Sequence, residues 1–194
     1  MPHSACIELD PTDRGTLLDV ARASIGSGLH TGSALQPGAD LLRGALAEPR
    51  AVFVTVTREA RLRGCIGSME ASQALVRSVA EAAYSAAFRD PRFPPLAGGE
   101  LASVRIEISV LSPMADLQVA SRVALLDQLS PGKDGLVVED GPHRATFLPK
   151  VWEQLPRPEQ FLDHLMAKAG LPSDHWSPQL RVQRYTTLSF TEPD

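Results

Sequence analysis

The side chain with the clearest capacity for chemistry is the thiol of Cys65, which stands in the glycine-rich segment of residues 62–67. Arg58, Arg61 and Arg63 precede it closely in the sequence. Positive charge beside a thiol favours the thiolate, which is the form that acts as a nucleophile or as a ligand. The segment is therefore a candidate site in which Cys65 reacts with, or contacts, a small ligand.

The two glycines of this segment, Gly64 and Gly67, are unusual in an extended conformation because they cost conformational entropy there. They predict a bulge, or a backbone left bare for the close approach of a ligand or of another chain segment. Both are therefore candidate ligand-binding residues.

Alternation along a strand assigns the six residues to two faces. Leu62, Gly64 and Ile66 are expected on one face, and Arg63, Cys65 and Gly67 on the other. This arrangement puts the thiol on the same face as Arg63, which we expect to bind an anionic group.

Glu107 lies in a later segment where β-branched and polar residues alternate. If that strand joins the sheet of Cys65, Glu107 is a candidate catalytic partner of the thiol, together with nearby threonines. The alternative is an ordinary glutamate on the exposed face of a strand.

A structural interpretation of Cys65 stays open beside the chemical one. Free cysteines are often small buried hydrophobic residues, and the arginines can form a solvated turn. The five histidines, at positions 3, 30, 143, 164 and 175, have no motif spacing to Cys65, so no general base is assigned. Cys6 and Cys65 do not form a disulfide framework, and no spacing typical of a metal site occurs. We therefore predict neither a metal nor a cofactor.

The composition bounds the class of protein. The chain has 194 residues, of which 43% are hydrophobic, enough for one domain with a substantial core or for two closely packed lobes. Its net charge of -4 disfavours general binding to nucleic acid or to an anionic membrane. The first residues lack a basic segment followed by an apolar one, and no apolar run is long enough to span a membrane. These features favour a cytoplasmic protein.

Hydrophobic periodicity predicts an α+β fold with a mainly antiparallel sheet and packed helices. Helices are expected from Pro11 to about residue 26 and over residues 39–47, 71–88, 123–129 and 158–169. Strands are expected over residues 51–57, 62–69, 104–110, 136–139, 144–148 and 180–190. The first two strands should form one hairpin, and residues 136–148 a second one around Asp140-Gly141-Pro142.

The segment Leu62 to Gly67 resembles the signature of the AMMECR family, called AmmeMemoRadiSam system protein A in bacteria. Five further blocks follow the family order and extend the resemblance to residues 10–190. They are Val52-Phe53-Val54-Thr55, Asp90-Pro91-Arg92-Phe93-Pro94-Pro95-Leu96, Ile106-Glu107-Ile108-Ser109-Val110-Leu111-Ser112-Pro113, Asp134-Gly135-Leu136-Val137-Val138 and Lys168-Ala169-Gly170-Leu171-Pro172.

The resemblance implies a single AMMECR-type domain over residues 1–194, with two unequal lobes around a cleft and the signature hairpin near that cleft. We place the lobes at residues 10–115 and 116–190, and the C-terminal strand could return to the first lobe. The resemblance also implies an association with a Memo-like protein and a radical S-adenosylmethionine protein.

Two positions depart from the family pattern. Lys150 stands where glutamine is usual, and Met166 stands where many members have a second cysteine. A mechanism that requires a pair of cysteines is therefore not expected in this chain.

Two functions from different classes follow from these observations. In the first, the chain is a small-molecule enzyme, or the substrate-handling part of one, with Cys65 as the nucleophile or contact and with Arg63 and Arg92 binding an anionic group. In the second, it is an adaptor without chemistry of its own, whose basic turn at Arg58 and Arg61 docks onto the Memo-like or radical partner. Arg92 has a structural alternative as well, because Asp90-Pro91 is a strong helix stop.

Overall fold

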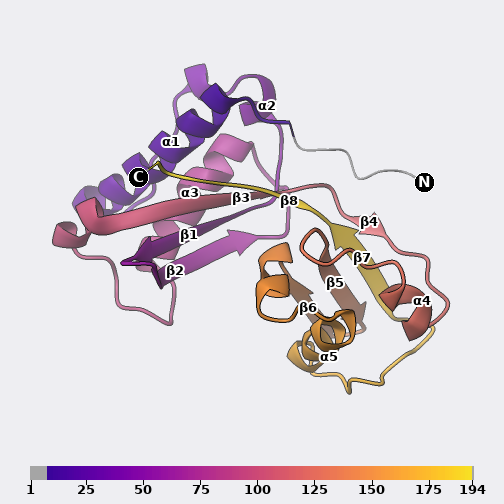
Figure 1. The fold of residues 1–194 in the computed structure, drawn as a ribbon. Helices are drawn as coiled ribbons and strands as arrows, with labels where there is room; N and C mark the ends of the chain where they lie inside the picture. Colours follow the sequence, from indigo (N-terminus) through magenta and orange to yellow (C-terminus); the bar gives the residue numbers. More distant parts are fainter. Residues whose placement is uncertain (1–7, 194) are drawn as a thin grey trace. The chain divides into compact units, whose positions relative to one another are not determined.

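The computed structural model describes residues 8–193 and contains two antiparallel four-stranded sheets with packed helices, which confirms the α+β prediction (Figure 1). Of these residues, 8–111 and 188–193 form the larger of two compact units, and 112–187 form the smaller. Cys6 lies outside the described residues. No helix within residues 8–193 is both long enough and apolar enough to cross a membrane.

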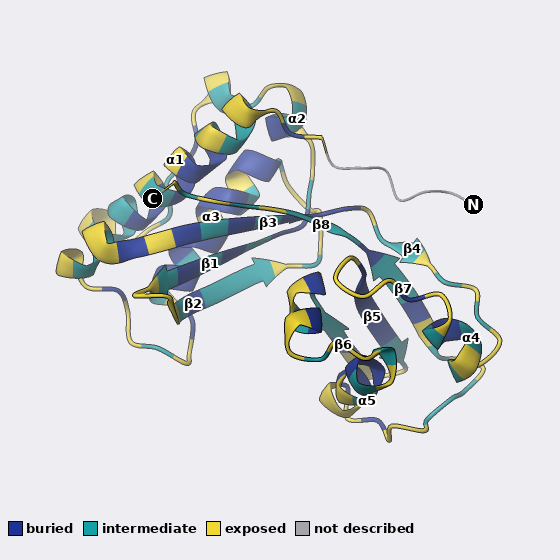
Figure 2. Ribbon diagram, in the orientation of Figure 1, coloured by how far each residue is buried: buried dark blue, intermediate teal, exposed yellow. Residues whose placement is uncertain are grey.

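The larger unit is built on a sheet of strand order β2-β1-β3-β8. Its strands are β1 (Val52–Arg58), β2 (Arg61–Ser68), β3 (Val104–Leu111) and β8 (Thr187–Thr191). The predicted hairpin is confirmed, since β1 pairs antiparallel with β2 on one side and with β3 on the other. Burial alternates along β3 as the sequence predicts, with fully buried Ile106 and Ile108 separated by half-buried Glu107 (Figure 2).

Two helices, α1 (Pro11–Thr31) and α3 (Leu75–Phe88), pack against the apolar face of this sheet. The unit also contains α2 (Gly44–Ala47) and the 3₁₀ segments η1 (Ala39–Leu41) and η2 (Gly98–Ser103). Alanines fill the buried side of α3 and allow the helix to lie close to the sheet. The predicted helix over residues 39–47 is wrong in extent, because the structure divides it into η1 and α2.

The first helix was expected to end near Gly26 and Gly28, and this boundary is wrong. A Cβ on Gly28 would lie 2.3 Å from a ring carbon of Phe88, so this glycine allows α1 to pack against α3. The helix ends instead at Gly32, whose φ of 71° is the left-handed conformation that suits glycine.

The smaller unit has a sheet of strand order β4-β7-β5-β6 and its own core. Its strands are β4 (Ala115–Asp116), β5 (Gly135–Asp140), β6 (His143–Phe147) and β7 (Arg181–Tyr185), and its helices are α4 (Arg122–Leu126), η3 (Pro149–Glu153) and α5 (Pro158–Lys168). The second predicted hairpin is confirmed by the antiparallel pairing of β5 with β6. The rings of Trp152 and Phe161 stack at 3.9 Å between centroids in the core.

The single strand predicted over residues 180–190 is wrong. The chain makes β7 in the smaller sheet and then β8 in the larger sheet, with Thr186 between them. The amide of Thr186 donates to Ser112 Oγ, and the carbonyl of Thr186 accepts from the Ser112 amide. Thr186 is therefore bonded to the segment that connects β3 to β4. Alternation alone does not reveal such a change of sheet, because both strands have the same period.

Candidate functional site

The thiol of Cys65 lies on the face of the larger sheet that is opposite to the helices. In the register of the sheet, Cys65 is opposite Thr55 on β1, and Thr55 is opposite Glu107 on β3. Directly paired residues point to the same face, so the three side chains form one row across three strands. The Thr55 hydroxyl donates a hydrogen bond to Cys65 Sγ at 3.2 Å.

All three residues of this row are half-buried, whereas the neighbouring β1 residues that point to the helices are buried. Val54 and Val56 on β1 have no exposed surface. Cys65 is therefore not a core hydrophobic residue, and its sulfur has a hydrogen-bond donor beside it. A sulfur that accepts such a bond is stabilised when it carries negative charge.

β2 is an edge strand, and at Cys65 its outward backbone groups are bonded by two side chains. The amide of Cys65 donates to Asp90 Oδ2 at 2.9 Å, and the carbonyl of Cys65 accepts from Arg92 Nη2 at 3.3 Å. Asp90 and Arg92 are themselves joined at 2.6 Å. Asp90 thus provides the acceptor, and Arg92 the donor, that a neighbouring strand would otherwise provide.

The electrostatics of this ion pair keep both groups charged. The hydrogen bonds from Arg92 hold the pKa of Asp90 well below its usual range, although burial acts in the opposite direction, and the amide of Cys65 adds to the lowering. The same bond to Asp90 raises the pKa of Arg92. The Asp90 side chain is 2% exposed and that of Arg92 is 54% exposed, so the guanidinium reaches solvent while its partner does not.

The strand is bulged at Arg63, so the regular alternation predicted for residues 62–67 is interrupted at this residue. Val56 pairs with Gly64 and the next residue, Thr57, pairs with Leu62, so Arg63 is the extra residue of β2. The bulge also moves Leu62 to the face of Thr57, opposite to the face predicted for it. The glycine-rich composition indicated a bulge, but not the residue at which it occurs.

The guanidinium of Arg63 binds Glu100, with Nε and Nη2 each 3.0 Å from a carboxylate oxygen. Its remaining bonds go to the carbonyls of Pro94 and Pro95. These bonds, above all those from Arg63, lower the pKa of Glu100 to about 2. Arg63 therefore ties β2 to the segment that follows α3, and its guanidinium is bonded to other parts of the chain.

The two glycines of the segment are covered by other parts of the chain. A Cβ on Gly64 would lie 1.9 Å from the carbonyl oxygen of Ala86 in α3, and one on Gly67 would lie 2.5 Å from Phe53 Cγ. Phe53 is the cross-strand partner of Gly67. Close approach of another chain segment is therefore observed at both glycines, in addition to the bulge at Arg63.

The turn of the hairpin carries the remaining predicted residues. Arg58 bonds Glu100 at 3.2 Å and has a side chain that is 44% exposed, and Arg61 is exposed. Between them, Glu59 and Ala60 both have a positive φ, of 52° and 59°. This is a conformation that non-glycine residues adopt at a cost of about 1 kcal/mol or more each.

Sequence reasoning missed Asp90 and Glu100 as parts of the site. Asp90 precedes a proline after a helix, and that pattern is explained by a helix stop alone. Glu100 follows two glycines in a loop, where no motif distinguishes it. Among residues 8–193 no group of three or more histidine, cysteine or acidic side chains could hold a metal ion.

The fold and the site define a class of α+β protein with a partly exposed thiol on an edge strand. Side chains bond the outward backbone groups of that strand at the thiol residue. The family model AMMECR1 matches residues 18–190, and the chain belongs to this family. It is 39% identical over 183 residues to a protein of Methanothermobacter thermautotrophicus, covering 91% of this chain and 93% of that one. It is 36% identical over 187 residues to a protein of Methanopyrus kandleri, covering 92% and 87%.

A solved structure has the same fold. The crystal structure of the uncharacterized protein PH0010 from Pyrococcus horikoshii matches with a TM-score of 0.82 and 34% identity, over 91% of this chain and 89% of that chain. The similarity extends over both units, because 91% of this chain cannot be confined to either one.

Proposed function

We propose that this AMMECR1-family protein handles a small polar or anionic substrate on the open face of the larger sheet, with Cys65 as the nucleophile or direct contact. The observation that carries this proposal is the hydrogen bond from Thr55 to a thiol that remains partly exposed. A nucleophilic cysteine needs access to its substrate and a partner that stabilises the charged sulfur.

The bonds that Asp90 and Arg92 make to the edge of β2 support this function. Asp90 and Arg92 fix the backbone of Cys65 from outside, and Gly64 lets α3 fix the strand from the core side. A reactive group whose backbone is fixed loses less entropy when a substrate binds. Arg92 is well placed to attract an anionic substrate, because its exposed guanidinium bonds the carbonyl of Cys65 and has no hydrogen bond at Nη1 among the described residues.

Alkylation by iodoacetamide tests the proposal in a Cys6→Ser background, where Cys65 is the single thiol. We expect Cys65 to react in the folded protein, and we expect Thr55→Val to slow the reaction about threefold to tenfold, because the charged sulfur loses its donor. The rate follows from mass spectrometry of the labelled protein at about pH 8.

Thr57→Val is the matched control, because this threonine lies on the same face and donates to the carbonyl of Arg105 at 3.4 Å. It should leave the rate unchanged. A Cys65 that stays unlabelled until urea unfolds the protein would contradict the proposal, and so would equal slowing by both valine variants.

An adaptor function is the second candidate, favoured by the exposed and strained turn at residues 58–61. Non-glycine residues at positive φ are often found where a protein binds a partner or a ligand. In this proposal the turn docks onto the Memo-like or the radical S-adenosylmethionine protein through Arg58 and Arg61. The thiol would then be dispensable.

Co-purification with these two partners separates the candidates. In the adaptor, the double variant Arg58→Glu/Arg61→Glu loses its partner. Arg77→Glu/Arg89→Glu, with the same charge change on α3 and at the residue that follows it, retains the partner. Cys65→Ser keeps biological activity in the adaptor and loses it in the enzyme. Retained binding after reversal of Arg58 and Arg61 would eliminate docking through this turn.

A further inference from the structure

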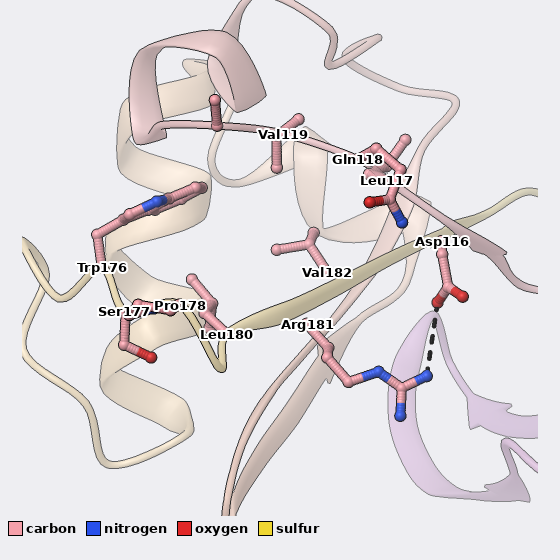
Figure 3. A pocket seen from close by; sticks show the side chains of 11 residues that line it. Asp116, Leu117, Gln118, Val119, Trp176, Ser177, Pro178, Leu180, Arg181 and Val182 are labelled. Atoms are coloured by element: carbon pink, nitrogen blue, oxygen red, sulfur yellow. Dashed lines mark ion pairs between the residues drawn. The ribbon is translucent and has the colours of Figure 1, made fainter.

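The smaller unit contains a pocket of about 530 Å³ at the point where β4 separates from β7 (Figure 3). The two strands pair over only two residues of β4, and the amide of Leu117 then donates to the carbonyl of Val182. Beyond this bond the chain leaves the sheet towards α4, and the gap forms the pocket. Its volume lies within the range of small-molecule sites, which is about 300–1,000 Å³.

One end of the pocket is apolar and aromatic. Figure 3 shows the Trp176 ring extending from its loop towards the side of the pocket where Val119 lies. Leu180, which precedes β7, and Val182 on β7 continue the apolar wall. Trp176 is half-buried and packs against the core of the smaller unit, which leaves part of its ring available.

The loop that carries Trp176 is held by one carboxylate. His175 Nε2 and Ser177 Oγ, the residues on each side of the tryptophan, both lie 2.6 Å from Asp140 Oδ2. Two short bonds from a β5 residue to flanking positions restrict the backbone between them. These bonds therefore hold the aromatic wall of the pocket in place.

The opposite end of the pocket carries two opposite charges. Asp116 and Arg181 lie 3.8 Å apart, with side chains that are 53% and 63% exposed (Figure 3). At this distance the pair is loose, since good charge-assisted bonds are about 2.7–2.9 Å long. Gln183 donates to Asp116 Oδ1, and Oδ2 of Asp116 has no hydrogen bond among the described residues. Each charged group thus retains capacity for a ligand.

We propose that this pocket binds a small zwitterion with an apolar side chain, of the amino-acid type. Its ammonium group pairs with Asp116 and its carboxylate with Arg181, and its side chain lies against Trp176. A ligand of a single charge would satisfy one of the two groups and repel the other. The site shares no residue with the Cys65 site and does not depend on the function proposed for the thiol.

Phenylalanine, 3-phenylpropionate and 2-phenylethylamine are the probes, because they share a ring and differ only in their charged groups. We expect saturable binding of phenylalanine, with a Kd on the order of 1 mM, by the fluorescence of Trp176 excited at about 295 nm, where the probes do not absorb. The two analogues should bind about tenfold more weakly, as each loses one charged contact.

Variants locate the site. In Trp176→Phe the remaining tryptophan, Trp152, is buried, so the fluorescence change should disappear. By calorimetry, Asp116→Asn and Arg181→Gln should each weaken phenylalanine binding about tenfold. Arg144→Gln is the matched control, because Arg144 forms an exposed ion pair with Glu139 at 3.4 Å on the same sheet and does not line the pocket.

Three results would overturn the proposal. The first is no saturable binding of any probe, and the second is equal affinity for phenylalanine and either analogue. The third is phenylalanine affinity that is unchanged in both Asp116→Asn and Arg181→Gln while near-ultraviolet circular dichroism shows the variants to be folded. Loss of the thiol chemistry in a Cys65 variant has no effect on these measurements.

Discussion

Each of the two sheets has an edge strand whose outward backbone groups are bonded by charged side chains. The two edges differ in whether both the amide and the carbonyl groups receive such a bond. At β2, Asp90 accepts from the amide of Cys65 while Arg92 donates to its carbonyl. At β6, Lys168 donates to the carbonyl of Thr146 at 3.0 Å. Lysine offers no acceptor, so it cannot satisfy an outward amide.

The difference reflects what each arrangement does with its charge. Asp90 and Arg92 compensate each other, which allows the carboxylate to be buried beneath the edge. Lys168 is exposed and its charge remains hydrated. Both arrangements discourage pairing with a foreign strand, as charged edges do, but only the ion pair also fixes the residue that it caps. The fixed residue is Cys65.

The largest effect is expected from Gly64→Ala. The new methyl group would meet the backbone oxygen of Ala86, which cannot rotate away, so α3 must move from β2 and carry Asp90 with it. We expect a loss of at least about 3 kcal/mol in the free energy of unfolding by urea. Gly99→Ala, where an added Cβ meets nothing within 4 Å, should change this free energy by less than about 0.5 kcal/mol. Equal losses in the two variants would show that close packing is not the cause.

The direct comparison of the two edges is Asp90→Ala against Lys168→Met. Removing Asp90 leaves a partly buried amide and a guanidinium without their acceptor, which should cost about 2–3 kcal/mol in urea unfolding. Removing the exposed ammonium should cost about 0.5 kcal/mol. The comparison fails if the lysine variant loses as much stability as the aspartate variant.

Acid should weaken the contacts around β2, where two carboxyl groups have a lowered pKa. Because the pKa of Glu100 is lowered to about 2 by Arg63, its contribution is complete above its ordinary pKa and is lost as the pH falls towards 2. The lowered pKa of Asp90 acts in the same direction. Urea unfolding between about pH 2.5 and 7 should show a steep acid limb that is shallower in Glu100→Gln, at a cost of about 1 kcal/mol near pH 7. Lys168→Met should retain the full limb.

The smallest effect concerns the turns of the two hairpins. The β5–β6 turn has Gly141 at a φ of 58°, whereas the β1–β2 turn holds Ala60 at 59°. Ala60→Gly should therefore stabilise the protein by about 0.5–1 kcal/mol, and Gly141→Ala should destabilise it by a similar amount. Thermal unfolding measures both, and stabilisation of the protein by Gly141→Ala would refute the argument.

Much of the secondary structure could be predicted from the sequence, because its signals are local. Alternation located β3, turn residues located the β5–β6 hairpin, and Pro158 marked the start of α5. The errors in the predicted elements arise from contacts between residues that are distant in the sequence. Gly28 resembles a helix end in the sequence, but its small size is explained by the packing of Phe88 from a neighbouring helix. Residues 180–190 have the pattern of one strand, but their two halves pair in different sheets.

The sequence by itself determined that residues 62–67 form a strand of a hairpin with a thiol and two costly glycines, since period, turn and composition are properties of neighbouring residues. The tertiary structure alone decided that Arg63 binds Glu100, 37 residues away, and that Cys65 is capped by Asp90, 25 residues away. It also opened the pocket beside Trp176. These arrangements depend on how helices and loops pack onto a sheet, and no short-range pattern records that packing.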